Sequence, residues 1–596
     1  MGWYHGKSLV PTARDFFIYG GGIFFEAGGV GMKVGQELTG AEILLEMLQA
    51  EGVRYIFGYP GGANLPIYQH MVNYPSIKHV LVRHEQGAAH MADGYARATG
   101  KPGICMATSG PGALNLVTGI ATAMMDSVPL IAITGQVPSS QIGRDAFQES
   151  DIIGVTMPIT KHSFLVTKVD EIAKVIKEAF YIATTGRPGP VLIDICRDAQ
   201  QAKTIFKVPE RIDIRGYKPT YKGNPRQIKK AAEALRAAKR PLILAGHGVI
   251  LANAQEELLR FAEACNIPVG TTLLGVGAFP VRHPLSLHMA GFMGTGYCNH
   301  AISETDTLLM IGMRVDDRVT TRIDSFAPKA QTIIHVDIDP SEIGKNLRPT
   351  IPIVGDAKTV LKQLMDELPS MPPRTEWLTL IERWKEEFPL RYPKSRNGFI
   401  QPQEVLEAIY ARCEDKAIVV ADVGQNQIWA ALWWNYSRPG LFMNSGGSGT
   451  MGFAFPASIG AKFGRPDLPV WCITGEGGFL MVMQELSVAV EHNLDLKVAI
   501  LNNRNLGMVR QFQDSFYGGV RHAVDLSYMP DIPKLADAYG CPGYKVEKRE
   551  DINKVLDKAI AYKGPVLIDF NIDPEANVYP IVPLGKGLLD FWEAPE

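Results

Sequence analysis

The sequence lacks the features that mark secreted, membrane-spanning and nucleic-acid-binding proteins. Its seven cysteines are an odd number, they are scattered from Cys105 to Cys541, and no Cys-x-x-Cys occurs. We therefore expect no disulfide framework and interpret the cysteines as buried free thiols in a reducing cytoplasm. No uninterrupted apolar run approaches the roughly 20 residues that span a bilayer. The formal net charge is −2 and no block of like charge stands out, which argues against a nucleic-acid or membrane partner.

Residues 1–31 also lack the marks of a targeting segment. They are rich in glycine and aromatic residues, without a basic start, an apolar run and a small-residue cleavage site. Met32 opens a far more regular stretch. We interpret residues 1–31 as an atypical N-terminal extension and Met32 as the functional start; an ordered arm that packs on a neighbour is the alternative.

What the chain does contain is an alternation of short apolar runs with longer amphipathic stretches. Runs rich in Val, Ile and Leu are typical of parallel strands buried on both faces, and helical patterns between them are typical of βαβ units. The sequence therefore predicts an α/β fold. The expected strands cover residues 103–107, 130–134, 191–195, 242–245, 308–311, 333–337, 418–421, 470–474, 498–501 and 566–570.

An internal repeat indicates that one domain is used twice. DEIAKVIKEAF (170–180) leads to GPVLIDI (189–195), and EDINKVLDKAI (550–560) leads to GPVLIDF (564–570). A second echo pairs PLIAITGQ (129–136) with PVWCITGE (469–476). A repeat of this length is interpreted as domain duplication.

The composition of two stretches, about 200–225 and about 367–400, is typical of linkers. Together with the repeat they predict three domains, each a parallel-sheet α/β unit, the first and last related by duplication. The expected boundaries are 1–31 for the extension, 32–205, 220–370 and 395–580 for the domains, and 581–596 for a C-terminal tail.

Polar residues follow two of the expected strands. Gly475-Glu476-Gly477 comes after strand 470–474, and Asn502-Asn503 comes after strand 498–501. Ligands bind at the carboxyl ends of strands in such sheets. A carboxylate and an amide oxygen are hard ligands, suited to a Mg²⁺ ion that also holds phosphate oxygens. Taken alone, the pattern is equally compatible with a turn and a surface loop.

This pattern resembles the thiamine-diphosphate motif, Gly-Asp-Gly followed by Asn-Asn. From Met32 nearly to its end the chain resembles the FAD-containing acetohydroxyacid (acetolactate) synthase large-subunit family. The matching runs include FGYPGGA (57–63), RHEQGAAHMADGYARATG (83–100), ATSGPGALNLVTGIATAMMDSVP (107–129), DAFQESDI (145–152), GSGTMGFAFPASIGA (447–461) and LGMVRQFQDSFY (506–517). The resemblance implies an N-terminal pyrimidine-binding domain, a central FAD-binding-type domain and a C-terminal domain for diphosphate and Mg²⁺.

The resemblance also assigns roles to single residues. A Glu at the position of Glu85 touches N1′ of the cofactor's aminopyrimidine ring and promotes loss of the thiazolium C2 proton. Met451 is the apolar wedge that bends thiamine diphosphate, and Gly449 offers its carbonyl to the 4′-amino group. The implied catalytic residues are Glu85, Phe147, Gln148, Arg197 and Met508. The implied thiamine-diphosphate contacts are Pro60, Gly424, Gln425, Asn426, Gly449, Met451, Gly475, Gly477 and Gly478.

Three further sets of residues are implied in the same way. The metal ligands are Glu476, Asn503 and Asn505. The substrate residues are Gly62, Ala63, Arg318, Val509 and Phe512, and Pro138 lines the same channel. Arg318 receives the carboxylate of the second keto acid by bidentate pairing. FAD, structural and not redox-active in this family, is expected near Arg187, Arg314 and Arg318.

Three residues depart from the family pattern. Glu476 stands where Asp is usual, and its longer stem is expected to weaken binding of a metal that demands near-ideal octahedral geometry. Phe512 stands where Trp is usual, which predicts a weaker preference for 2-ketobutyrate as acceptor. Met293 stands where His is usual near the flavin, which makes FAD retention an open question.

The resemblance implies decarboxylation of pyruvate and carboligation to a second 2-keto acid, pyruvate or 2-ketobutyrate, in branched-chain amino-acid biosynthesis. The expected protein is a cytoplasmic homodimer or homotetramer, with a small regulatory subunit as a possible partner. In this family the cofactor lies between the first domain of one chain and the last domain of another. Two alternatives stay open: another thiamine-diphosphate 2-keto-acid carboligase or decarboxylase with altered acceptor, and a degenerate non-catalytic paralogue.

Overall fold

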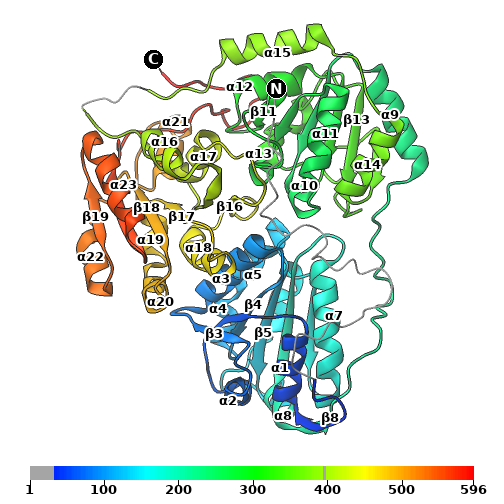
Figure 1. Ribbon diagram of the computed structural model, residues 1–596, viewed down its shortest axis with the longest axis vertical. Coiled ribbons are helices and arrows are strands. Elements are labelled where there is room, and N and C mark those ends of the chain that lie inside the picture. The colour runs from blue at the N-terminus through cyan, green and yellow to red at the C-terminus, as the bar shows by residue number, and fades with distance from the viewer. Residues whose placement is uncertain (1–31, 394–397, 596) are drawn as a thin grey trace.

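All ten apolar runs singled out above form strands, because each is buried on both faces of a parallel sheet. The computed structural model describes residues 32–393 and 398–595, so the expectations for residues 1–31 lie outside the described residues. Within the described part, three six-stranded sheets are each covered by helices, as Figure 1 shows. The predicted three-unit α/β fold is confirmed.

The first sheet has the strand order β3-β2-β4-β5-β7-β6, and every neighbouring pair is parallel. Its strands are β2 (Tyr55–Gly58), β3 (Lys78–Leu81), β4 (Gly103–Ala107), β5 (Leu130–Gln136), β6 (His162–Val166) and β7 (Pro190–Cys196). Its helices are α1 (Gly40–Ala50), α2 (Leu65–Met71), α3 (Glu85–Thr99), α4 (Pro111–Asn115), α5 (Val117–Asp126), α6 (Ile152–Thr156), α7 (Ile172–Thr184) and α8 (Arg197–Gln201). A small antiparallel pair, β1 (Glu37–Thr39) and β8 (Lys203–Ile205), joins the start of this unit to its end.

The middle sheet has the order β11-β10-β9-β12-β13-β14, again all parallel. Its strands are β9 (Pro241–Ala245), β10 (Val269–Thr271), β11 (Ser286–Met289), β12 (Thr307–Ile311), β13 (Thr332–Asp337) and β14 (Ile351–Val354). Its helices are α9 (Pro225–Ala237), α10 (His247–Leu251), α11 (Gln255–Cys265), α12 (Gly296–Glu304), α13 (Asp317–Thr320), α14 (Ala357–Glu367) and α15 (Thr375–Glu387). Asn224 and Asp356 cap α9 and α14 with their side-chain oxygens, which sets where these helices begin.

The last sheet has the order β16-β15-β17-β18-β20-β19, all parallel. Its strands are β15 (Ile418–Ala421), β16 (Phe442–Asn444), β17 (Val470–Thr474), β18 (Leu496–Asn502), β19 (Gly543–Val546) and β20 (Val566–Asn571). Its helices are α16 (Pro402–Cys413), α17 (Gln425–Trp433), α18 (Ala454–Gly464), α19 (Glu476–Leu480), α20 (Leu486–Glu491), α21 (Gly507–Phe516), α22 (Ile532–Tyr539) and α23 (Ile552–Ala561).

Strand order supports the domain duplication, but only one of the two repeated sequence patterns joins equivalent strands. Counted from β3 and from β16, the two sheets place β7 and β20 at the same position, so the helix–strand echo joins equivalent elements. The second echo, however, pairs β5, fourth in its sheet, with β17, third in its sheet. The two PxxxITG segments therefore do not occupy equivalent strands of the duplicated domain. Their similarity reflects that both are buried parallel strands.

The stretch 367–400 is more than a linker. It contains α15, whose Trp377, Ile381 and Trp384 are buried in the apolar cluster of the middle sheet. The C-terminal tail also packs there: Leu588 is buried in the same cluster, and the Val582 amide donates to the Phe292 carbonyl (2.9 Å). The linker prediction is wrong for this stretch, because burial of its apolar side chains stabilises a helix despite the Pro- and charge-rich composition.

Helices α3 and α18 join the first unit to the last and pack closely beside each other in Figure 1. A Cβ on Gly94 would lie 1.9 Å from the Ala457 carbonyl oxygen, and one on Gly460 would lie 1.8 Å from that of Met91. Glycine is required at both positions because the two backbones touch.

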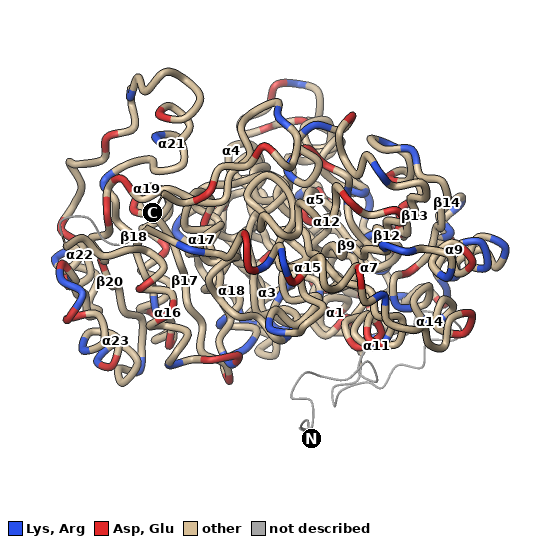
Figure 2. Tube along the Cα trace, turned by 90° about the horizontal axis from the view of Figure 1, so that it is seen from above, with Lys and Arg blue, Asp and Glu red and all other residues tan. Residues whose placement is uncertain are grey.

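Charges of both signs are spread over the outside in Figure 2. Among the described residues, no helix is both long and apolar enough to cross a membrane.

Candidate active site

The carboxyl ends of β17 and β18 bring Glu476 and Asn503 together, as their positions after neighbouring strands predict. The backbone amide of Asn505 donates to Oε1 of Glu476 (2.8 Å) and to Oδ1 of Asn503 (3.1 Å). The side chain of Asn505 donates to the backbone carbonyl of Asn503 (2.8 Å). Two side-chain oxygens, from Glu476 and Asn503, thus accept from one backbone N–H group at the edge of the last sheet.

Glu476 is a buried carboxylate, and no basic side chain of the described part of the chain forms an ion pair with it. Burial raises the pKa of Glu476 to about 7, and the bonds from backbone amides oppose that shift. A divalent cation would stabilise the ionised form, and the carboxylate and amide oxygens are ligands that Mg²⁺ accepts. The donor set therefore fits the expected metal, although the described residues hold no group of three His, Cys, Asp or Glu side chains arranged for one.

The glycines around Glu476 serve close packing. Gly475 is extended, and a Cβ on Gly477 would lie 3.0 Å from Leu506 and one on Gly478 2.9 Å from Asp422. Neither Gly477 nor Gly478 has a positive φ. Both glycines lie in the first turn of helix α19, which begins at Glu476.

Asp422, which sequence reasoning missed, holds the turns of the site together. It follows β15 directly and accepts hydrogen bonds from the amides of Val423 (2.7 Å), Gly452 (3.0 Å) and Ala454 (3.3 Å). Burial raises its pKa to about 6, against the effect of these bonds. Its position at a strand end is the same signal that identified Glu476.

Two glycines beside Asp422 adopt left-handed backbone angles, Gly424 with φ 120° and Gly449 with φ 66°. Gly424 precedes α17, whose first turn has no side-chain cap. Uncapped amides at a helix start attract anions, so this turn fits a diphosphate. The side-chain amides of Gln425 and Asn426 bond to protein groups: Gln425 to Gln511 and Asn503, Asn426 to the Asp422 carbonyl.

A cavity of about 770 Å³ is lined by residues of all three units. Its size is within the range of cofactor sites. The predicted residues that line it are Arg187, Arg314, Arg318, Gly424, Gly449, Met451, Met508, Val509 and Phe512. Met293, the departure from the family, lines it too and is buried.

The arginines of the cavity have different partners. Arg187 donates to Ser127 (2.8 Å), Asp339 (3.3 Å) and Glu342 (2.9 Å), so its charge is balanced by two carboxylates. Arg318 is more exposed and lies over the Phe292 ring (5.2 Å to the centroid).

Phe292 in turn meets Phe512 edge-on, with centroids 6.1 Å apart. Arg318 and Phe512 therefore flank one aromatic ring that lines the cavity.

Glu85 begins α3 at the edge of the first sheet. Nδ2 of Asn115 donates to Oε2 of Glu85 (2.9 Å). Just before it, the Arg83 amide donates to both oxygens of Glu485 (3.1 Å each), a buried carboxylate from the last unit. A Cβ on Gly87 would lie 2.7 Å from Glu485, so the glycine allows this contact. Glu485 thus anchors the start of the helix that carries Glu85.

The remaining predicted residues lie at the same edge of the first sheet, on loops after its strands. Gln200 donates to the carbonyl of Ala63 (2.8 Å), and Asp198 accepts from the Ser139 amide (3.0 Å), which fixes the turn next to Pro138. Phe147 is 88% exposed. The members of this group are Pro60, Gly62, Ala63, Pro138, Phe147, Gln148 and Arg197.

The structure therefore brings the predicted residues together as two groups. One is at the first sheet, with Glu85, and the other is at the last sheet and the cavity, with Glu476. Within residues 32–393 and 398–595, no hydrogen bond or ion pair joins Glu85 to Glu476, Asn503 or Asn505.

Three models of thiamine pyrophosphate enzyme domains match this chain. They are the N-terminal TPP binding domain (residues 38–155), the central domain (228–364) and the C-terminal TPP binding domain (422–570).

Curated relatives match nearly the whole chain. An acetolactate synthase of Mycobacterium bovis is 47% identical over 92% of this chain and 90% of its own length. A probable acetolactate synthase large subunit of Methanocaldococcus jannaschii is 49% identical over 93% and 95%. An acetolactate synthase large subunit of Haemophilus influenzae is 45% identical over 92% and 96%.

Proposed function

The chain belongs to the thiamine pyrophosphate enzymes, among the acetolactate synthase large subunits, and we propose that it decarboxylates pyruvate and joins the remaining carbons to a second 2-keto acid. The observation that carries this function is the edge of the last sheet. There Glu476 and Asn503 present oxygen ligands beside the Asp422-held turns and next to a cofactor-sized cavity.

The residues of this edge would hold thiamine diphosphate through Mg²⁺. Glu476 and Asn503 would ligate the metal, with Asn505 completing the turn, and the amides at the start of α17 would meet the diphosphate. Gly449 and Met451 would contact the rings from the cavity wall. When bound, thiamine diphosphate supplies the electron sink for the bond that breaks on decarboxylation.

Other side chains would handle protons and substrate. Glu85 would share a proton with the aminopyrimidine ring, because its Oε1 accepts no hydrogen bond from the described residues. Arg318 would pair with the carboxylate of the second keto acid, and Phe512 would border its alkyl group.

FAD would occupy the part of the cavity lined by Arg187 and Arg314. A Cβ on Gly248, at the start of α10, would lie 2.6 Å from Gly312, just after β12. Both glycines line the cavity, and the lack of side chains lets their backbones approach each other closely there.

Glu85 and Glu476 belong to different sheets and share no hydrogen bond or ion pair among the described residues, which supports a homodimer with the cofactor between two chains. Both units also carry large exposed apolar side chains, which are candidates for a subunit interface. In the first unit they include Leu114, Phe147, Val155 and Met157, and in the last unit they include Met481, Val509, Tyr517, Val520 and Tyr528. We place the enzyme in the cytoplasm, where its buried cysteines stay reduced.

One experiment distinguishes the candidate functions. The purified chain is incubated anaerobically with pyruvate, thiamine diphosphate, Mg²⁺ and FAD, and acetolactate is measured as acetoin after acid treatment. We expect acetolactate. Release of acetaldehyde alone would favour a decarboxylase, and absence of pyruvate consumption would favour a non-catalytic paralogue. Phe512 is the specific feature that favours a carboligase with altered acceptor.

A further inference from the structure

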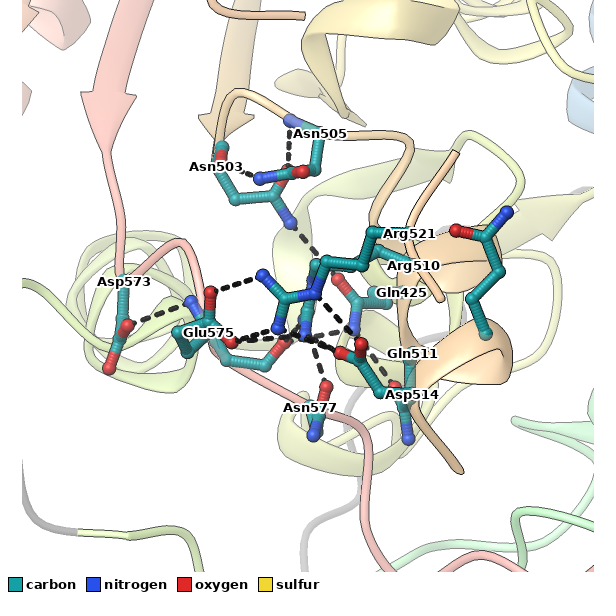
Figure 3. Close-up of polar contacts among 12 residues, drawn as sticks. Gln425, Asn503, Asn505, Arg510, Gln511, Asp514, Arg521, Asp573, Glu575 and Asn577 are labelled. Carbon is teal, nitrogen blue, oxygen red and sulfur yellow. Dashed lines mark hydrogen bonds and ion pairs between the residues drawn. The ribbon is translucent and has the colours of Figure 1, made fainter. Parts of the chain in front are cut away.

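A chain of buried side-chain amides runs from Asn503 to the segment after β20, and Figure 3 shows its members side by side. Nδ2 of Asn503 donates to Oε1 of Gln425 (3.0 Å). Nε2 of Gln425 donates to Oε1 of Gln511 (2.9 Å) and to the Ala576 carbonyl (2.9 Å). Asn503, Gln425 and Gln511 are each at most 5% exposed, so water does not substitute for these bonds.

The backbone of Val578 sets the direction of this chain. Its amide donates to Oε1 of Gln511 (2.9 Å), and its carbonyl accepts from Nε2 of Gln511 (3.0 Å). Because a backbone N–H only donates and a carbonyl only accepts, Gln511 has one possible orientation. Its Oε1 must face Gln425.

That orientation propagates to the metal site. Gln425 must turn its NH₂ group to Gln511 and the Ala576 carbonyl, which leaves its Oε1 for Asn503. Asn503 must then turn its NH₂ group to Gln425 and its Oδ1 to the side of Glu476 and the Asn505 amide. A flip at any link would set two donors or two acceptors against each other in the protein interior, which is costly.

Close packing of Gly507 holds the Gln425 and Asn503 amides against each other. A Cβ on Gly507, the first residue of α21, would lie 2.1 Å from Oε1 of Gln425 and 2.5 Å from Nδ2 of Asn503. Helix α21 can therefore begin here only with glycine. The same helix carries Met508, Val509 and Phe512 into the cavity.

The segment after β20, which anchors these amides, is itself held by the buried Arg510 and by surface ion pairs. Arg510 on α21 donates to the Ala576 carbonyl (2.7 Å) and to Oδ1 of Asn577 (2.8 Å) and pairs with Asp514 (3.0 Å). Arg521 pairs with Asp514 and, by two nitrogens, with Glu575, as Figure 3 shows. The backbone that orients Gln511 is thus held on both sides.

We propose that Gln511 and Gln425 are positioning residues that hold the Asn503 amide with its oxygen toward the metal, so that α21 and the segment 573–578 determine metal affinity. This role rests on the proposed function, since it requires a metal at Glu476 and Asn503. Partners of metal ligands commonly change metal affinity by about 10- to 100-fold when they are replaced.

The test measures Mn²⁺ binding to the full chain with thiamine diphosphate, by the loss of the free-Mn²⁺ resonance signal, for the parent, Gln511→Glu and Gln511→Met. Gln511→Glu keeps the shape but removes the donor that faces the Val578 carbonyl. We expect the Mn²⁺ dissociation constant to rise by about 10-fold or more in both variants. The added charge of Gln511→Glu would by itself tighten cation binding, so weaker binding has to come from lost orientation.

Gln513→Glu is the matched control. Gln513 lies on the same helix and makes the same two bonds to a backbone unit, with its Nε2 donating to the His522 carbonyl (3.0 Å) and its Oε1 accepting from the His522 amide (3.1 Å). It has no bond to Gln425, so its replacement should leave Mn²⁺ affinity unchanged. Thermal unfolding checks that each variant is folded. If Gln511→Glu is unfolded, the Mn²⁺ affinity of Gln511→Met is the test.

The outcomes separate this role from the proposed function. Parent-like Mn²⁺ affinity in the Gln511 variants overturns the positioning role and leaves the metal site intact. An equal loss in Gln513→Glu also overturns it, because α21 would then respond to any disturbance. If the unchanged protein binds no Mn²⁺ in the presence of thiamine diphosphate, the proposed metal site is wrong, and the positioning role is wrong with it.

Discussion

Glu85 has one oxygen bonded to Asn115 and one that accepts no hydrogen bond from the described residues, a state suited to sharing a proton with a bound molecule. Glu85→Gln keeps the Asn115 contact in shape but cannot take up a proton. We expect turnover to fall by about 10²- to 10⁴-fold, the usual contribution of general acid–base catalysis. Thiamine diphosphate affinity and the unfolding temperature should stay the same. Near-native acetolactate formation by this variant would remove Glu85 from the mechanism.

Glu476 is the residue at which this chain and its family pattern differ most. Its carboxylate reaches the Asn505 amide at 2.8 Å from a longer stem than Asp has. We predict that Glu476→Asp tightens thiamine diphosphate binding at fixed Mg²⁺, because the shorter stem restores octahedral geometry at about 2.0–2.1 Å. Titration of the cofactor, followed by quenching of tryptophan fluorescence, measures the effect. Weaker binding would show that the turn is built around Glu.

Phe512 lines the cavity and meets Phe292, over which Arg318 lies. Phe512→Trp should raise the preference for 2-ketobutyrate over pyruvate, since a larger ring fills the pocket around the extra methylene, an effect worth about 1–3 kcal/mol. The ratio of the two products in a competition assay measures it. Phe516→Trp is the control, because Phe516 contacts Phe512 without lining the cavity. An unchanged ratio in Phe512→Trp would show that the residue does not touch the acceptor.

At the scale of elements, the crossing of α3 and α18 depends on glycine. A Cβ on Gly460 would lie 1.8 Å from the Met91 carbonyl oxygen, so Gly460→Ala must push the helices apart. Overpacking of this kind costs about 1–3 kcal/mol or more, and we expect a lower unfolding temperature by calorimetry. Gly62→Ala is the stability control, because no described residue lies within 4 Å of its added Cβ. Equal unfolding temperatures for the two variants would contradict the close crossing.

For the whole molecule, one buried ion cluster joins all three units. Arg97 pairs with Asp93 (2.6 Å) and Asp126 (2.8 Å) and donates to the Asn444 carbonyl (3.1 Å). Asp126 also accepts from the Gly447 amide (2.7 Å), and its carbonyl contacts His247 of the middle unit (2.9 Å). Although burial opposes its charge, the two carboxylates raise the pKa of Arg97.

Arg97→Met would leave two carboxylates buried without a cation, which costs about 3–5 kcal/mol. We expect a marked fall in the unfolding temperature. Arg83→Met is the matched control: Arg83 also joins the first unit to the last, through Glu491 (2.8 Å), but at the surface, where a pair is worth about 0–1 kcal/mol. Similar losses in the two variants would show that the buried cluster does not hold the units together.

The sequence by itself determined the fold class and placed Glu476 and Asn503 at one edge of the last sheet. Ten apolar runs predicted strands because full burial on both faces leaves an unmistakable composition. Glu476 and Asn503 were found because each follows a strand directly, and parallel neighbours end at one edge. Local patterns of this kind need no knowledge of distant residues.

Only the tertiary structure decided what depends on contacts between distant segments. The bonds of Gln511 to Gln425 and Val578 join residues 86 and 67 positions apart, and no local pattern marks them. Helix α15 lies where the sequence predicted a linker, because Trp377 and Trp384 are buried against the middle sheet. The predicted site residues form two groups because Glu85 and Glu476 belong to different sheets, which the α3–α18 crossing and the Arg97 cluster join.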